Sequence, residues 1–166
     1  LLRVVDDPTT AMSMLNEDLS ERSEDGTFVT LFLAILAPDG TVRSLNAGHP
    51  TAFVWRAASG EVTRIAGHGP ALGMMEGFPY EESDTCKLED GDVLLLITDG
   101  LAEARHEDAP DDLYGEERLE ELLREAGPKA ENAQALTEAV VESVLAFAAG
   151  QREDDMTVVC VRRVGS

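Results

Sequence analysis

The most constraining feature of the sequence is a short apolar run that stops on an acid. In GDVLLLITDGLAEAR (Gly91 to Arg105), residues 93–98 are apolar or nearly so, and Asp99 and Gly100 follow directly. A short continuous apolar run predicts a strand that is buried on both faces. A carboxylate at the end of such a strand is expensive to desolvate unless a positive group meets it. We therefore expect a cation beside Asp99.

A second stretch, REDDMTVVCVRR (Arg152 to Arg163), has the mirrored form, with Asp154 and Asp155 directly before an apolar strand. If the two strands are antiparallel neighbours, the end of the first adjoins the start of the second. Asp99 and Asp154 would then share one rim of the sheet, while Asp155 would alternate to the opposite face.

Two carboxylates held close together repel each other unless a cation neutralises them. Hard oxygen ligands with no Cys or His nearby suit Mg²⁺ or Mn²⁺ and do not suit zinc. Such an ion lowers the pKa of bound water and orients it for attack on phosphorus. The alternative is that both acids merely cap turns beside strands, as Asp commonly does. Spacing alone favours this alternative.

The composition excludes several classes of partner. The chain has 166 residues and a formal charge of −20, with 33 acids against 13 Lys and Arg. Nucleic acids and anionic membranes need a basic footprint, so neither is an expected partner. No apolar run approaches the ~20 residues that a membrane span needs. Cys86 and Cys160 are far apart and lack metal-ligand spacing, which indicates two buried thiols in a reducing cytoplasm.

The pattern along the chain is typical of the α+β class, with strands early, helices late and one closing strand. The first helix is expected at 8–22, with Asp7 as its N-cap and Pro8 at its first position. Strands are expected at 27–37, which looks covered on both sides, and at 41–47, 51–57 and 61–66. These four would form one antiparallel meander. We further expect an exposed strand within 80–92, helices at 101–108, 116–126 and 132–149, an irregular segment at 109–115, and a last strand at 156–164.

Five motifs occur in a familiar order: LNAGHP, GPALGM, LEDGDVLLLITDGLAEAR, YGEERL and DDMTVVCVR. Together they resemble the bacterial SpoIIE-like branch of the PPM family, the metal-dependent serine/threonine protein phosphatases. The resemblance implies an antiparallel β-sandwich flanked by helices (αββα), with a dinuclear Mn²⁺ or Mg²⁺ site at one edge. It also implies hydrolysis of phosphoserine or phosphothreonine by a metal-bridging water, without a covalent intermediate.

The resemblance assigns roles to particular residues. Asp99 of TDG resembles the family's metal-bridging carboxylate, and Asp154 resembles the last metal ligand. Gly100 and Asp155, which stands where the family often has Asn or Asp, are further candidate ligands. His68 and Gly69 lie on the loop GHGPALG, which could flank a substrate, although no basic residue accompanies them to hold a phosphate.

The family's first motif, Gly-Asp-x-x-Gly, should precede the helix at 8–22, where the printed sequence has only LLRVVD. We therefore expect residues 1–166 to form a single PPM-type domain that begins after this motif, and the half-site that remains to bind metal weakly. Family partners are phosphorylated regulatory proteins, typically anti-anti-sigma factors of the STAS fold, and a sensor domain often lies upstream. The alternative is a non-catalytic PPM-like module that binds a partner or forms a homodimer.

Overall fold

The computed structural model describes residues 7–22, 26–65, 67, 69–83 and 85–165. These residues form two compact units, one from the described parts of Leu1–His49 and Ile65–Lys87, the other from those of Pro50–Arg64 and Leu88–Ser166. All pairs of named strands with a defined register are antiparallel, and each unit also contains helix. The expected α+β class is confirmed.

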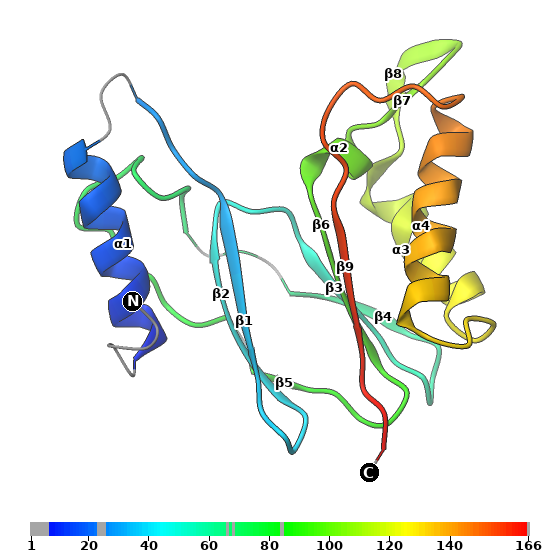
Figure 1. Cartoon of the computed structure of the whole chain (residues 1–166), viewed down its shortest axis with the longest axis horizontal. Helices are drawn as coiled ribbons and strands as arrows, with labels where there is room; N and C mark the ends of the chain where they lie inside the picture. The colour runs from blue at the N-terminus through cyan, green and yellow to red at the C-terminus, as the bar shows by residue number, and fades with distance from the viewer. Residues whose placement is uncertain (1–6, 23–25, 66, 68, 84, 166) are drawn as a thin grey trace. The chain divides into compact units, whose positions relative to one another are not determined.

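The first unit contains one helix and a three-stranded sheet (Figure 1). Its elements are α1 (Pro8–Arg22), β1 (Leu31–Leu36), β2 (Thr41–Ala47) and β5 (Cys86–Lys87), with the sheet order β1-β2-β5. Helix α1 packs through an apolar face, and the core of this unit comprises Met12, Leu45, Ala47, Leu72 and Tyr80.

Helix α1 begins where the sequence predicts. Asp7 caps it by accepting a hydrogen bond from the backbone N–H of Thr10 at 2.9 Å. Hydrogen bonds from the hydroxyls of Thr9 and Thr10 and from this N–H lower the pKa of Asp7 to about 2. The prediction that Asp7 is an N-cap followed by Pro8 at the first helical position is therefore confirmed.

Strand β1 is less covered than its apolar sequence suggests. Its residues are half-buried and Leu36 is exposed, so the prediction of a strand covered on both sides is wrong. Strand β1 lies at the edge of the three-stranded sheet, and among the described residues β2 is the strand that pairs along it, so an apolar sequence alone overestimates its cover.

The four early strands form where expected, but they do not make one meander. The chain leaves the first sheet at residues 48–50. There the Asn46 side chain forms two hydrogen bonds with the backbone of His49: Oδ1 accepts from its N–H at 2.8 Å, and Nδ2 donates to its carbonyl at 2.9 Å. Gly48 has a φ of 68° and donates its N–H to the carbonyl of Gly69 at 2.9 Å. These contacts hold a left-handed turn that no hairpin pattern anticipates, and the next strand joins the other sheet.

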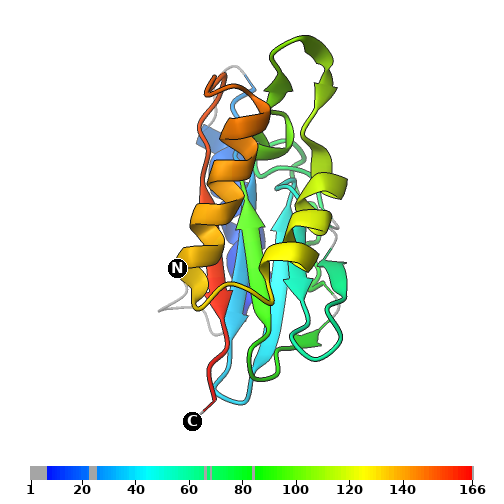
Figure 2. The ribbon, with the colours of Figure 1, turned by 90° about the vertical axis from the view of Figure 1, so that its right-hand side faces the viewer.

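The second unit holds a four-stranded sheet in the order β4-β3-β6-β9. The strands are β3 (Ala52–Trp55), β4 (Val62–Ile65), β6 (Val93–Ile97) and β9 (Val158–Arg162). Helices α3 (Gly115–Ala126) and α4 (Ala133–Phe147) cover one face of this sheet (Figure 2). One apolar core joins the sheet to the helices, and it includes Val93, Leu95, Ile97, Leu119, Leu123, Leu136, Val140 and Val144. The helices expected at 116–126 and 132–149 and the buried strand at 93–98 are thus confirmed.

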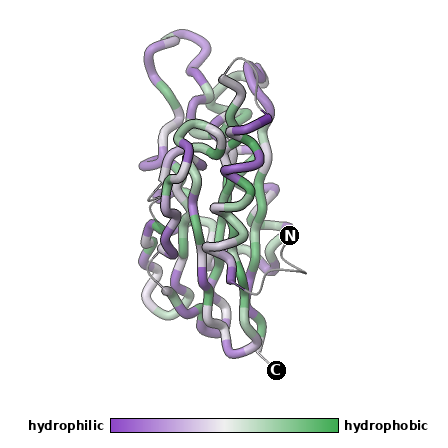
Figure 3. The backbone as a smooth tube through the Cα atoms, turned by 90° about the vertical axis from the view of Figure 1, so that its left-hand side faces the viewer, coloured by the Kyte–Doolittle hydropathy of each residue, from purple (hydrophilic) through white to green (hydrophobic). Residues whose placement is uncertain are grey.

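The segment after β6 differs from its expected form. Helix α2 (Asp99–Ala102) is a single turn, and β7 (Arg105–His106) then pairs with β8 (Ala109–Leu113) as a hairpin. The hairpin is hydrophilic along most of its length (Figure 3). The predictions of a helix at 101–108 and an irregular segment at 109–115 are wrong, because Arg105 and His106 pair with residues of β8. Arg105 Nη1 also donates a hydrogen bond to the Pro110 carbonyl at 2.7 Å, which supports the hairpin.

Two expectations from composition can be compared with this fold. Within the described ranges, no helix has both the length and the apolarity that crossing a bilayer demands. Cys86 and Cys160 form no disulfide and are half-buried, where full burial was expected. Burial raises the pKa of the Cys160 thiol.

Candidate metal centre

The candidate centre lies where β6 ends and β9 begins. The two strands pair antiparallel, with Ile97 opposite Val158. The ladder continues one step further, because Thr98 donates its N–H to the carbonyl of Thr157 at 3.1 Å. The predicted pairing is confirmed, so the segments that carry Asp99 and Asp154 meet at one rim of the sheet.

Thr98 links the end of β6 to the segment before β9 through hydrogen bonds. Its hydroxyl donates to the carbonyl of Asp155 at 2.9 Å and accepts the N–H of Thr157 at 2.9 Å. One side chain therefore bridges the end of β6 to the two residues on either side of Met156. This bridge fixes the loop before β9 against the turn that follows β6.

Gly100 lets the two segments approach closely. A Cβ at this position would lie 2.6 Å from the carbonyl oxygen of Asp155 and 3.3 Å from Cβ of Asp154. Real Cβ atoms essentially never show a contact as short as the first of these, and the atom met is rigid backbone. The lack of a side chain at Gly100 thus allows the Asp154–Asp155 backbone to pack against it. That Gly100 is itself a metal ligand stays a prediction.

The two carboxylates have similar surroundings. Asp99 Oδ1 accepts the N–H of Gly100 at 3.0 Å, and Asp154 Oδ1 accepts the N–H of Asp155 at 2.7 Å. Both residues are exposed, as is Asp155. The premise that Asp99 ends its strand in a buried place is wrong, since the chain emerges from the core between Ile97 and Asp99. Desolvation therefore does not require a cation here.

The donor chemistry nevertheless fits a hard cation. In the described part of the chain, no Lys, Arg or His forms an ion pair with Asp99 or Asp154, and in each of them only Oδ1 accepts a hydrogen bond. Mg²⁺ is usually held by one or two carboxylates and keeps several waters. The described residues contain no group of three or more His, Cys, Asp or Glu that could hold a metal ion. Asp99 and Asp154 would accordingly supply two protein ligands, with water completing the coordination.

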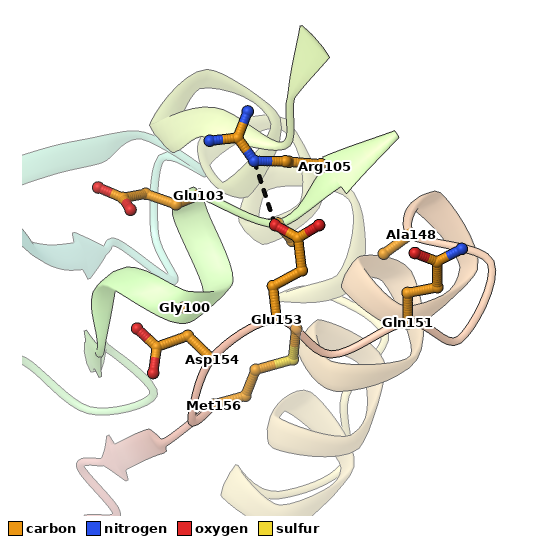
Figure 4. A pocket seen from close by; sticks show the side chains of 9 residues that line it. Gly100, Glu103, Arg105, Ala148, Gln151, Glu153, Asp154 and Met156 are labelled. Carbon is orange, nitrogen blue, oxygen red and sulfur yellow. Dashed lines mark ion pairs between the residues drawn. The ribbon is translucent and has the colours of Figure 1, made fainter. Parts of the chain in front are cut away.

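A small pocket of about 70 Å³ adjoins this rim (Figure 4). Two of its lining residues, Arg105 and Glu153, form an ion pair, with Nε 3.1 Å from Oε2. The lining comprises Gly100, Glu103, Ala104, Arg105, Ala148, Gln151, Glu153, Asp154 and Met156. Sequence reasoning missed Arg105 and Glu153, although both lie within a few residues of the acids that it singled out.

The predicted substrate loop belongs to the first unit. His68 lies outside the described residues. A Cβ at Gly69 would lie 2.7 Å from a ring carbon of Tyr80, so this glycine makes room for a buried ring. A role of either residue beside a substrate stays a prediction.

We expect Gly100→Ala to weaken binding of Mn²⁺ by about 10-fold or more, a size typical of residues that orient metal ligands. The added methyl group would push the Asp155 carbonyl away and displace Asp154 with it. Isothermal titration with Mn²⁺ measures the change. Gly60→Ala is the control for backbone strain alone, since Gly60 has a φ of 73° and a Cβ there meets no atom within 4 Å. Equal affinities for the two variants would contradict the assigned role of Gly100.

Comparison with known proteins decides the family. A model of the family described as Stage II sporulation protein E (SpoIIE) matches residues 1–164. The chain belongs to the SpoIIE family. Stage II sporulation protein E of Bacillus subtilis is 29% identical over 157 residues, which are 94% of this chain and 18% of that protein. Phosphoserine phosphatase RsbU of the same organism is 26% identical over 161 residues, 94% of this chain and 45% of the relative. This SpoIIE-family chain thus spans less than half the length of these two relatives.

The fold agrees with this membership. The phosphatase domain of the cell fate determinant SpoIIE from Bacillus subtilis, in crystals presoaked with Mn, superposes with a TM-score of 0.69. The identity is 27%, and the match covers 96% of this chain and 68% of that one. The fold of the SpoIIE-family chain is accordingly that of PPM-type, or PP2C, phosphatase domains, as its motifs predict.

Proposed function

We propose that this chain is the catalytic part of a metal-dependent serine/threonine protein phosphatase. Its substrate would be a phosphoserine or phosphothreonine on a bacterial regulatory protein, such as an anti-anti-sigma factor, in the cytoplasm. The observation that carries the proposal is the convergence of Asp99 and Asp154 at one end of the β6–β9 ladder. A relative named as a phosphoserine phosphatase and a structural neighbour presoaked with Mn support it.

The chemistry follows from what the chain's own residues do. Asp99 and Asp154 would hold Mn²⁺ or Mg²⁺ through their open oxygens, and two ions are expected in the complete centre. The bound cation supplies an acidified water and charge neutralisation for phosphoryl transfer. Thr98 and Gly100 keep the two carboxylates in register. The exposure of both acids leaves room for a phosphorylated side chain carried by a folded protein.

The charge of the molecule is consistent with this class of partner. At a formal −20 the chain lacks the basic footprint of a nucleic-acid or anionic-membrane binder. A phosphoprotein partner would dock through its own basic or apolar surface. A sensor domain in the whole protein would then regulate when this docking leads to hydrolysis.

The competing proposal is a non-catalytic interaction or dimerisation module of the same fold. One observation favours it: the described residues provide two carboxylates and no cluster of three metal-ligating side chains. Turnover separates the two proposals, because a module without a working centre cannot hydrolyse phosphate esters.

The test is Mn²⁺-dependent hydrolysis of an aryl phosphate, with the chain as printed and with any longer form that its gene encodes. We expect turnover that appears with Mn²⁺, disappears with a chelator and returns on adding Mn²⁺ again. If a folded longer form of the protein shows no turnover at saturating Mn²⁺ and at saturating Mg²⁺, the catalytic proposal is contradicted and the interaction module is the better account. Circular dichroism provides the folding control.

A further inference from the structure

The pocket beside the candidate centre carries more negative than positive side chains. Three of its lining residues are carboxylates, Glu103, Glu153 and Asp154, and its one cationic side chain is Arg105. A phosphorylated side chain carries close to two negative charges at neutral pH. Such a group is repelled by these carboxylates and by a chain with a net charge of −20. A cationic group on the protein that faces the reacting phosphate would offset this repulsion.

Arg105 has the geometry for that role. Its Nη1 donates to the carbonyl of Pro110 at 2.7 Å, which anchors the guanidinium to the β7–β8 hairpin. Its Nε lies 3.1 Å from Glu153 Oε2, and the side chain is 46% exposed. No described residue accepts a hydrogen bond from Nη2. The planar guanidinium presents its donors in a fixed fork that matches phosphate oxygens.

Other arginines of the second unit are held away from this pocket. Arg118 donates to the Asp112 carboxylate and to the carbonyl of Tyr114, and it lies over the Phe147 ring. Arg124 donates to Glu120 on the same helix. Neither side chain lines the pocket with Asp154.

We propose that Arg105 binds the phosphate group of the substrate, and that Glu153 positions the guanidinium until the phosphate replaces it. The proposal rests on the proposed function, because it adds a substrate-binding residue to the same centre. The exchange needs little rearrangement: the Arg105–Glu153 pair is exposed, and exposed ion pairs are weak. The hydrogen bond from Arg105 Nη1 to the Pro110 carbonyl would persist, so Arg105 could bind the phosphate without refolding of the hairpin.

The experiment measures inorganic phosphate affinity by isothermal titration with Mg²⁺ present, and kcat and KM for an aryl phosphate with Mn²⁺. We expect Arg105→Ala to weaken phosphate binding and to raise KM by about 10-fold or more, as for loss of a charged hydrogen bond, with a smaller change in kcat. Arg105→Lys should restore part of the affinity. Glu153→Gln should tighten phosphate binding by about 2–5-fold, because the competing carboxylate charge is gone.

Arg152→Ala is the matched control, since it removes an exposed arginine that is adjacent to Glu153 in sequence and does not line the pocket. If Arg105→Ala and Arg152→Ala have the same phosphate affinity, or wild type binds no phosphate, the inference about Arg105 is overturned even if turnover is found. If phosphate binds through Arg105 but wild type shows no metal-dependent turnover, the anion site stands and the proposed function fails. Thermal denaturation of every variant shows that each one is folded.

Discussion

Replacing Asp99 with Asn is expected to reduce Mn²⁺-dependent hydrolysis by roughly 100-fold or more, because a bound cation contributes several kcal/mol to such a reaction. Asparagine keeps the shape of the side chain, and its Oδ1 still accepts the N–H of Gly100. The substitution thus removes the charge and leaves the turn intact. Steady-state kinetics at saturating Mn²⁺, together with titration of the metal, measures the effect.

Asp154→Asn should have an effect of the same order, for the same reason. The double variant should lose little more than either single one, because residues that hold one ion act as a unit. The control is Asp111→Asn, an exposed acid on the β7–β8 hairpin that does not line the pocket. Retention of more than half of the activity in Asp99→Asn would show that this carboxylate holds no catalytic metal.

The largest effect on stability is expected from Asp92→Ala, at about 3–5 kcal/mol of unfolding free energy. The Asp92 side chain is 3% exposed and forms an ion pair with Arg56 at 2.8 Å. It also accepts the N–H groups of Ala57 at 2.9 Å and Glu89 at 3.0 Å. Removing the carboxylate takes away the acceptor that the Ala57 and Glu89 N–H groups share with Arg56, where the β3–β4 turn meets the turn before β6. Urea denaturation at pH 7 measures the loss, with Asp111→Ala as the exposed control.

The same carboxylate makes stability depend on pH. Burial raises the pKa of Asp92, but hydrogen bonds from the Glu89 N–H, the Arg56 guanidinium and the Ala57 N–H outweigh burial and hold the pKa below its ordinary value. A group whose pKa is lowered by folding contributes stability that is complete above its unfolded pKa, near 3.9, and is lost as pH falls through the folded value. The difference in stability between wild type and Asp92→Asn should therefore shrink as the pH falls below about 4. A difference that stays constant from pH 7 to pH 3 would contradict this assignment.

Local signals in the sequence account for much of the fold. Asp7 and Pro8 mark the start of α1, and the helical spacing of apolar residues marks α3 and α4, because capping and amphipathic periodicity act within a few residues. The pairing of β6 with β9 follows from two apolar runs with acids at matching ends. The division of the early strands between two sheets depends on Asn46 and Gly48, whose contacts are made by the folded chain.

The candidate site could be predicted only in part. Sequence reasoning identified Asp99 and Asp154 and placed them at one rim, since alternation and antiparallel pairing fix which strand ends meet. It assigned the wrong environment to Asp99, because exposure depends on how the chain leaves the core after Ile97. It missed Arg105 and Glu153, because their ion pair exists only if residues 105–113 fold as a hairpin.

The chain between β6 and β9 is one long connection that joins two neighbouring strands. It leaves one strand of the sheet, forms the β7–β8 hairpin and helices α3 and α4, and returns to the adjacent strand. The separation of Asp99 from Asp154 is fixed by the ladder and by Thr98, so it is independent of the length of the path between them. Insertions between α3 and α4 would lengthen this connection without moving its two ends. The connection between β6 and β9 could thus be replaced by another, in evolution or by engineering, while Asp99 and Asp154 keep their positions.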